Sequence, residues 1–442
     1  MTGNQTLIAR VAISVLAGGA GIFLVHNRRL RTLPAASFDR FLTITFAASR
    51  LALFAGTFLI LRLEPRGDVP SFYLLDALDV TRGLLPYRDF PTSYAPLHPY
   101  LDALLLHLWH SPLSMILFAI LAEIVMVPLW VRIARQFIVE DELRVAALLY
   151  LTSTISLQFV TIDGQDNVII ALLLALALFL LRRNAPLTAG LSIGAGIAAI
   201  KFLPLIYAPV FFFTSRRRWL IALGALLLIV PIYAAFALHH APILLPFTSE
   251  GAMRSSGDLP FIVEAIANIN LPSALTDGFL IAVFAAIYTL VARRALAADH
   301  TTRLRLITFG MAAITLAFLV FVKKSWPPYL LLALFPICLV FARRASQSPA
   351  RRVSYASLFA LFGVIAVVEH SWWATVLGQL TASELHQGLA LGLWKQGVFL
   401  ALEILLVAGY LWLFAQSLRA LLGPASSSAF NETPPATLRI TL

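Results

Sequence analysis

Long apolar runs constrain the fold of this chain more than any other feature of its sequence. A helix needs about 20 apolar residues to cross the hydrocarbon core of a bilayer, and thirteen runs approach or reach that length. They occupy residues 8–26, 41–62, 112–133, 143–161, 166–183, 187–200, 202–215, 219–238, 273–293, 304–322, 327–342, 353–370 and 396–418. Charged residues make up only 12% of the chain, whereas a soluble domain carries about 25%. The sequence therefore predicts an all-α, polytopic transmembrane helical bundle.

Short basic clusters between the runs indicate how the chain is oriented. The formal net charge is +11, and it is carried by loop clusters such as HNRRLR, VRIAR and SRRRW. An excess of Lys and Arg in short loops marks the cytoplasmic side of a membrane protein. With the N-terminus outside, the basic loops all fall inside: 27–40, 134–142, 182–186, 216–218, 294–303 and 343–352. The charge thus reports orientation, and we expect no nucleic-acid partner.

The first run and the single cysteine give two further limits. Residues 8–26 lack a sizeable basic flank and an obvious cleavage site, so we expect a retained span and not a signal peptide. Cys338 is the only cysteine of the chain and lies in an apolar run, which excludes disulfides and cysteine metal sites within the chain.

One lysine lies at apolar depth. Runs 187–200 and 202–215 are too short to span comfortably, and they meet at Lys201 in the sequence AAIKFLPL. Broken helices of this kind are tolerated where the backbone lines a cavity enclosed by protein. An ionisable residue inside a membrane is costly, so Lys201 is a candidate functional residue, with snorkelling or pairing with an acidic residue such as Glu123 as the alternative.

The outer loop 63–111 concentrates charge in an otherwise apolar chain. It contains Asp68, Asp76, Asp79 and Asp89, with Arg82, Arg88 and His98 nearby. A carboxylate at the mouth of a membrane cavity can act as general base on an acceptor hydroxyl, while a cation stabilises a phosphate leaving group. The alternative is that these are ordinary solvated loop charges.

Polar residues also mark two other outer boundaries. The sequence IDGQDN ends in Gln165, Asp166 and Asn167, which are able to hydrogen-bond a sugar or simply cap the next helix. The sequence FVKKSWPPY places Lys324 beside aromatic residues. Such a cation suits a phosphate or an anionic headgroup, or serves as an interfacial anchor.

Four stretches together resemble one known family. In order and spacing, GLLPYRDFPTSYAPLHPYL, TIDGQDNVIIALLLALALFLL, AGLSIGAGIAAIKFLPLIYAPVFFF and KKSWPPYLLLALFP resemble the GT-C membrane glycosyltransferases of family 87. These are the polyprenol-phosphate-mannose-dependent α-mannosyltransferases and their bacterial relatives. The resemblance covers about residues 41–345. It implies a GT-C bundle of about 12–13 spans in a bacterial inner membrane, with the active site facing the periplasm or cell exterior.

The resemblance also implies a division of the chain. Residues 1–40 are expected to form an extra N-terminal transmembrane helix and a basic cytoplasmic loop, and residues 41–419 the GT-C domain. The polar, proline-bearing segment 420–442 is expected to be a flexible cytoplasmic tail.

The resemblance further implies roles for individual residues. The catalytic base of the family precedes a tyrosine, then a glycine and PY, which makes Asp68 its counterpart through Tyr73, Gly83 and Tyr87, with Asp76 or Asp79 as alternatives. The expected contacts to the donor phosphate are Lys201, Lys324, Arg82 and Arg88. The expected contacts to the sugar or acceptor are Tyr87, Asp89, Tyr94, His98, Gln165, Asp166, Asn167 and Tyr329.

The implied reaction moves a sugar, mannose by default, from a polyprenyl-phosphate donor to a glycolipid or glycan acceptor, with inversion. No metal or other cofactor is required by the sequence, and membrane lipids are the expected surroundings. Three other readings remain open: a transporter or flippase of a lipid-linked saccharide, a surface-polysaccharide polymerase or ligase, and a non-enzymatic scaffold.

Overall fold

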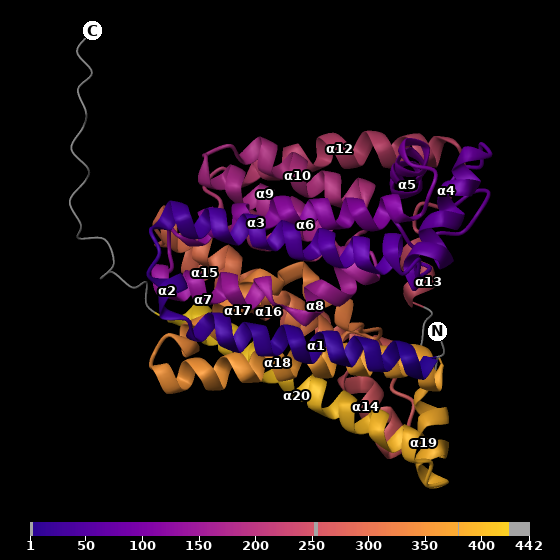
Figure 1. Cartoon of the computed structure of the whole chain (residues 1–442). Coiled ribbons are helices and arrows are strands. Elements are labelled where there is room, and N and C mark those ends of the chain that lie inside the picture. The colour runs from indigo at the N-terminus through magenta and orange to yellow at the C-terminus, as the bar shows by residue number, and fades with distance from the viewer. Residues whose placement is uncertain (1–2, 252–254, 379, 424–442) are drawn as a thin grey trace.

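The computed structural model describes residues 3–251, 255–378 and 380–423, which form a bundle of helices (Figure 1). Ten helical segments among these residues are long and apolar enough to cross a membrane. They are α1 (Gly3–His26), α3 (Ala35–Phe54) with η1 (Ala55–Ile60), α6 (Leu113–Ala134), α7 (Glu140–Leu151) with α8 (Thr154–Ser156) and η3 (Leu157–Ile162), α12 (Arg218–Leu238), α15 (Ser273–Leu296), α16 (His300–Phe321), η5 (Pro327–Ala333) with α17 (Leu334–Ala345), α18 (Pro349–Trp372) with η6 (Trp373–Leu377), and α20 (Trp394–Leu422).

Three shorter apolar helical segments complete the set: α9 (Asn167–Arg182), α10 (Pro186–Ala199), and η4 (Leu203–Ile206) with α11 (Ala208–Thr214). Every one of the thirteen apolar runs therefore coincides with a helix, and the polytopic all-α prediction is confirmed. The predicted break at Lys201 is also confirmed, because α10 ends at Ala199 and the next helical turn begins at Leu203.

The remaining short helices lie at the two ends of the bundle. They are α2 (Arg28–Arg31), η2 (Val69–Tyr73), α4 (Leu74–Thr81), α5 (His98–Leu108), α13 (Leu245–Gly251), α14 (Leu259–Ala267) and α19 (Ala382–Ala390). In Figure 1, α4, α5, α13 and α19 gather at the right-hand end, whereas the arginine-rich α2 lies at the opposite end. The two ends thus differ in both shape and charge.

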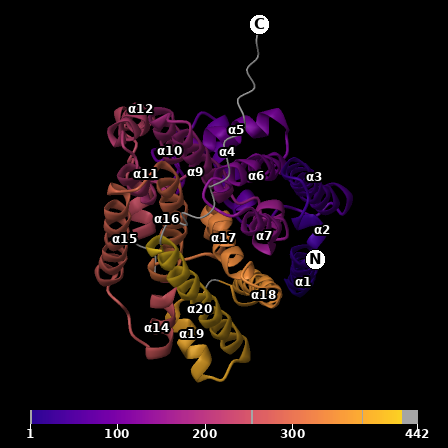
Figure 2. The same ribbon diagram turned by 90° about the vertical axis from the view of Figure 1, so that its left-hand side faces the viewer.

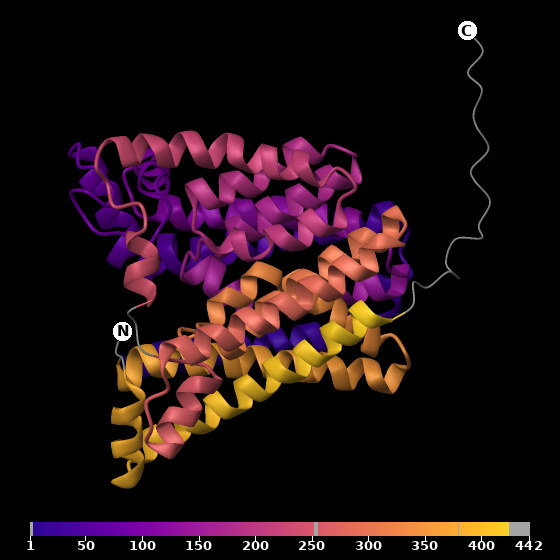
Figure 3. The same cartoon turned by 180° about the vertical axis from the view of Figure 1, so that it is seen from behind.

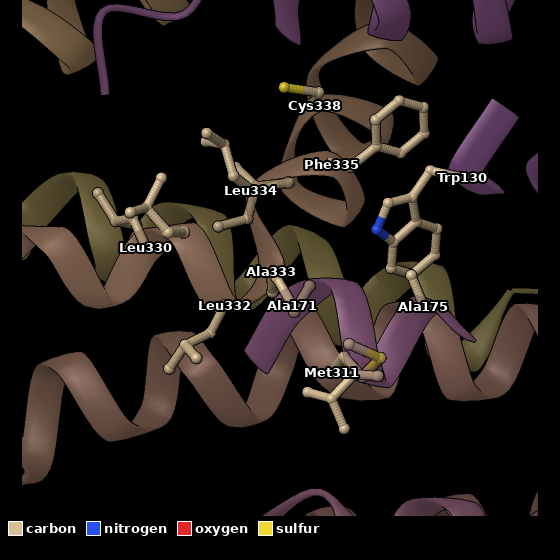
Figure 4. Close-up of a cluster of buried hydrophobic side chains, with 14 of the residues drawn as sticks. Trp130, Ala171, Ala175, Met311, Leu330, Leu332, Ala333, Leu334, Phe335 and Cys338 are labelled. Atoms are coloured by element: carbon tan, nitrogen blue, oxygen red, sulfur yellow. The ribbon is translucent and has the colours of Figure 1, made fainter. Parts of the chain in front are cut away.

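Three segments form the centre of the bundle. In the most apolar 18-residue stretch of each span, 89% of the residues are buried in α16 and 83% in both α7–η3 and η5–α17. In α12 the share is only 17%. Trp130 of α6 stacks on Phe335 of α17 with ring centroids 5.7 Å apart, beside the buried Cys338 (Figure 4). Seen from behind, α12 runs along the upper side of the bundle and α20 along the lower side (Figure 3).

Close helix packing supports the broken helix α10. A Cβ atom on Gly190 would lie 2.1 Å from the carbonyl oxygen of Ile221, and one on Gly224 would lie 2.1 Å from that of Leu187. Gly190 and Gly194 are four residues apart, the small-residue spacing that allows membrane helices to approach closely. Helix α10 is therefore held backbone to backbone against α12, which fixes the position at which Lys201 emerges.

The structure also refines three expectations. Residue 41 lies inside α3 and residue 420 inside α20, so neither predicted boundary falls between helices; the division into parts stays a prediction. Residues 424–442 of the predicted tail lie outside the described residues. In mid-bundle, Arg50 Nε lies 3.6 Å from Glu123 Oε2, so these two buried charges pair with each other.

Candidate functional site

The loop between η3 and α9 lies at the centre of the candidate site. Gly164 has a φ of +66°, and a Cβ atom there would lie 2.8 Å from Ile116 and 2.9 Å from Val69. Only glycine satisfies both the backbone angle and the space. The close approach lets the polar residues 163–167 lie directly against the start of η2, where Asp68 lies.

Asp68 lies immediately before η2 and contacts this loop. Its carboxylate accepts a hydrogen bond from Gln165 Nε2 at 3.0 Å. Burial raises the pKa of Asp68 above its ordinary value, while the positive charge of Lys201 acts in the opposite direction. Asp68 is therefore held near a cation without being paired to it, and its affinity for a proton is increased.

Lys201 reaches the same loop from the end of α10. Its Nζ donates to Asp166 Oδ1 at 2.6 Å, and both side chains are largely buried. Burial opposes ionisation of Asp166, but Lys201 and His98 outweigh it and hold the pKa of this carboxyl at about 2. Lys201 thus pairs with Asp166 and not with Glu123, the partner considered from the sequence.

His98 extends this charged cluster. Its Nε2 lies 3.4 Å from Asp166 Oδ2, and its Nδ1 lies 3.0 Å from Asp102 Oδ2. Burial lowers the pKa of His98, but Asp102 and Asp166 raise it to about 9, so the ring is protonated at neutral pH. Lys201, Asp166, His98 and Asp102 therefore form a row of alternating charges.

Aromatic rings cover this row. Tyr94 stacks on His98 with centroids 4.5 Å apart, and Lys201 Nζ lies 4.8 Å from the centre of the same Tyr94 ring. The edge of Tyr73 meets both rings, at 5.2 Å from Tyr94 and 5.1 Å from His98. The buried Tyr73 hydroxyl has no hydrogen-bond partner in the described part of the chain.

Backbone hydrogen bonds tie the segments of the site together. Ala95 N donates to the Ile200 carbonyl and Leu97 N to the Ala198 carbonyl, each at 3.1 Å. These bonds fix the loop that carries Tyr94 and His98 to the broken end of α10. Residues from four distant parts of the sequence therefore meet at one end of the bundle.

Several predicted residues lie apart from this cluster. Arg82 pairs with Asp79 at 3.1 Å and Arg88 with Asp89 at 2.9 Å, as local ion pairs in which both arginines are exposed. Hydrogen bonds from Arg88 and from a backbone amide lower the pKa of Asp89 to about 2. The structure therefore does not bring these four side chains to the charged row.

Two further predicted residues, Asp76 and Tyr87, have other surroundings. Asp76 of α4 is buried and accepts from Thr92 Oγ1 at 2.7 Å; burial raises its pKa to about 6 although the hydrogen bond acts against this. The Tyr87 hydroxyl donates to the Tyr94 carbonyl, and its ring packs on Phe236. Tyr87 thus supports the loop and does not enter the cluster.

Asn167 and Tyr329 lie near the cluster. Asn167 is the first residue of α9, and its Nδ2 donates to Gln165 Oε1 at 3.4 Å. Tyr329 lies in η5 and is an electrostatic neighbour of Tyr94. The backbone of Lys324 pairs with that of Ser256 through a short parallel bridge after α16.

Sequence reasoning missed a buried ion pair behind the loop. Arg10 of α1 donates hydrogen bonds to both carboxylate oxygens of Asp163, with Nη1 2.9 Å from Oδ2. The backbone carbonyl of Arg10 accepts a hydrogen bond from Gln158 Nε2 at 3.0 Å. The signal was present, because Arg10 is an ionisable residue within an apolar run. The first helix therefore contacts the candidate site directly.

The chemistry of the cluster is that of charge and hydrogen bonding. Within the described residues, no group of three or more His, Cys, Asp or Glu side chains has the arrangement of a metal site. The cluster offers two carboxyls whose pKa burial raises, those of Asp68 and Asp102, together with one lysine and with amide and hydroxyl groups suited to sugar hydroxyls.

Comparison with known families decides the class of protein. The sequence model of glycosyltransferase family 87 matches residues 94–322, more than half of the chain. The chain belongs to glycosyltransferase family 87. It is thus a multi-pass membrane glycosyltransferase, and the resemblance seen in the sequence is confirmed at that level. No curated protein and no solved structure matches the chain.

The family 87 match divides the candidate site. It includes Tyr94, His98, the loop 162–167 and Lys201. It begins after Asp68 and ends before Lys324 and Tyr329, so these three residues lie outside the matched region.

Proposed function

We propose that this family 87 protein transfers a sugar, mannose by default, from a polyprenyl-phosphate donor to the hydroxyl of a glycolipid or glycan acceptor. The observation that supports the proposal is that a carboxyl group and a cation both contact the loop 162–167. Asp68 contacts Gln165 at 3.0 Å, and Lys201 contacts Asp166 at 2.6 Å. A carboxyl and a cation thus flank one loop at a single end of the bundle.

The proposed step is a single displacement at the anomeric carbon. The acceptor oxygen forms the new bond to that carbon as its proton passes to Asp68, and the bond from the same carbon to the phosphate oxygen breaks. The bonding electrons leave with polyprenyl phosphate, which gains a negative charge. Attack opposite the leaving group inverts the anomeric configuration.

The residues support this step in distinct ways. A raised pKa suits Asp68 for accepting a proton near neutral pH. Lys201 stabilises the departing phosphate, aided by Lys324, while Gln165, Asn167 and Tyr94 offer groups for sugar hydroxyls. No step requires a metal. The lipid tail of the donor stays in the bilayer, at the outer face of a bacterial inner membrane.

The test is transfer of radiolabelled sugar from synthetic polyprenyl-phosphate donors by the purified full-length protein in lipid nanodiscs. Asp68→Asn is expected to lower the rate by about 100-fold or more, the usual contribution of a general base. Asp79→Asn removes the same charge from an exposed pair in the same loop and is the matched control. It should cost less than about fivefold, since an exposed ion pair contributes at most about 1 kcal/mol.

Asp76→Asn tests the remaining alternative, that Asp76 and not Asp68 is the base. If Asp76→Asn abolishes transfer and Asp68→Asn does not, the base is assigned wrongly. If neither variant loses transfer, or if the wild type moves lipid-linked saccharide across vesicles without transferring it, the proposed reaction is wrong.

A further inference from the structure

A polar cavity opens at the opposite end of the bundle from the candidate site. It has a volume of about 680 Å³ and is lined by Arg132, Arg135, Arg182, Arg183 and His300, among others. These residues come from the end of α6, the end of α9 and the start of α16. None of the residues lining this arginine cavity is acidic.

Three of its four arginines have no acidic partner in the described residues. Arg135 is neutralised by Asp39 at 2.8 Å and by Glu140 at 3.0 Å. The charged groups that act on Arg182 are Arg183 and Arg132, which repel it. Arginines in a cytoplasmic loop ordinarily point apart into water, so this convergence is unfavourable unless an anion occupies the cavity.

Neighbouring groups hold two of the guanidinium groups in place. Arg182 and Arg183 both lie over the ring of Phe179, with centroid distances of 5.6 and 5.4 Å. With its amide oxygen facing Arg182, Gln136 accepts from Nε at 2.5 Å. Planar guanidinium groups fixed in this manner match the geometry of phosphate oxygens.

The position of the cavity is set by α9. This helix begins at Asn167 in the candidate site and ends at Arg182 in the arginine cavity, and its 16 residues span about 24 Å. The hydrocarbon core of a bilayer is about 30 Å thick, so the cavity lies near the level of the lipid phosphates of the other leaflet. Its volume exceeds that of one phosphate and falls in the range of about 300–1,000 Å³ typical of ligand pockets.

We propose that the arginine cavity is a binding site for an anionic group with two phosphates, held by Arg132, Arg182 and Arg183. The unpaired charges sum to three, which suits a ligand with at least two negative charges. Two sources share this chemistry: a lipid with two phosphates in its headgroup, and a soluble diphosphate. The site is separate from the proposed reaction and stands whether or not that reaction is correct.

The test measures binding to the purified full-length protein by native mass spectrometry. The probes are a diphosphatidyl lipid, phosphatidylcholine and inorganic pyrophosphate. Arg182→Gln/Arg183→Gln is expected to weaken binding of the diphosphate probe at least about tenfold, since charge-assisted hydrogen bonds from two guanidinium groups to phosphate are lost. Arg28→Gln/Arg29→Gln removes two exposed charges from α2 at the same end and should leave the affinity unchanged.

The outcomes distinguish the source and decide the proposal. Tight binding of the diphosphatidyl lipid alone assigns a headgroup site, and equal binding of pyrophosphate assigns a soluble diphosphate. Equal losses in both double variants, or no preference over phosphatidylcholine, would overturn the site. If the Gln variant does not fold, Arg182→Lys/Arg183→Lys retains the charge and is expected to weaken binding through loss of the planar fork.

Discussion

The aspartates of this protein differ in role because their surroundings differ. Asp166 faces Lys201 and His98, which hold its pKa at about 2, so it is a fixed anion at any physiological pH. Asp68 contacts Gln165, the neighbour in sequence of the residue that Lys201 contacts. Burial raises the pKa of Asp68. Asp79 lies outside this cluster, in an exposed pair with Arg82. Among these three, only Asp68 combines a raised pKa with a nearby cation, Lys201, that is hydrogen-bonded to another carboxylate.

The first prediction concerns the pH dependence of transfer. A base must be ionised, so kcat/KM is expected to rise with pH through the pKa of Asp68, above the ordinary aspartate value of 3.8. Lys201 lowers that pKa, so Lys201→Gln should move the acid limb of the profile to higher pH, in addition to reducing the rate. Profiles of wild type and variant measure the shift. An acid limb that does not move would show that Lys201 and Asp68 are not electrostatically coupled.

At the scale of elements, Gly164 determines how closely the loop 162–167 approaches η2. The second prediction is that Gly164→Ala displaces this loop, because of the positive φ and because the new Cβ would lie 2.8 Å from Ile116. The strain is expected to lower the free energy of unfolding by about 1–3 kcal/mol, seen as a lower melting temperature, and to reduce the rate of sugar transfer. Gly83→Ala is the control, since Gly83 has a φ of +84° but no atom within 4 Å of the added Cβ. Equal effects of both substitutions would mean that backbone strain alone, and not the close approach, explains the result.

Helix α1 is the other element on which the site depends. It packs along α18 (Figure 2), and a Cβ atom on Gly18 would lie 2.8 Å from Ala360 of that helix. It also carries Arg10 to Asp163. The third prediction is that Arg10→Met destabilises the protein by about 3–5 kcal/mol, because a buried carboxylate is left without its partner. Arg10→Met/Asp163→Asn should recover most of the loss. Melting temperatures of the wild type, Arg10→Met, Asp163→Asn and the double variant measure the coupling, and additive losses in the double variant would contradict it.

The sequence predicted the elements better than their contacts. Apolar run length located the ten long apolar helical segments and the three shorter ones, because burial in a bilayer depends on local composition. It did not reveal the contact of Arg10 with Asp163, whose partners are 153 residues apart. It also suggested Arg82 and Arg88 as phosphate ligands, whereas the structure gives each a local acidic partner. An ion pair between neighbours in sequence competes with a contact to a ligand or to a residue far away in the sequence. Only the folded structure shows which of the two contacts forms.

At the scale of the whole molecule, our proposals give the two ends of the bundle different functions: sugar transfer at one end and binding of a diphosphate group at the other. The short helices and the charged row lie at one end, and the arginine cavity and α2 at the other (Figure 1). The positive-inside rule predicts that the end with α2 faces the cytoplasm. On that prediction the proposed transfer occurs at the outer face, where a lipid-borne donor would present its sugar.

The fourth prediction tests this orientation by labelling single cysteines. Cys338 is the only cysteine and is buried, so Cys338→Ala supplies an unreactive background. In that background, Arg88→Cys is expected to react with a membrane-impermeant maleimide in intact cells, because Arg88 is exposed at the end of the bundle with α4. Arg29→Cys in α2 should react only after the cells are permeabilised, since it lies at the arginine-rich end. The reverse pattern would place the charged row in the cytoplasm, where it would meet nucleotide sugars, and would remove the reason for a polyprenyl-phosphate donor.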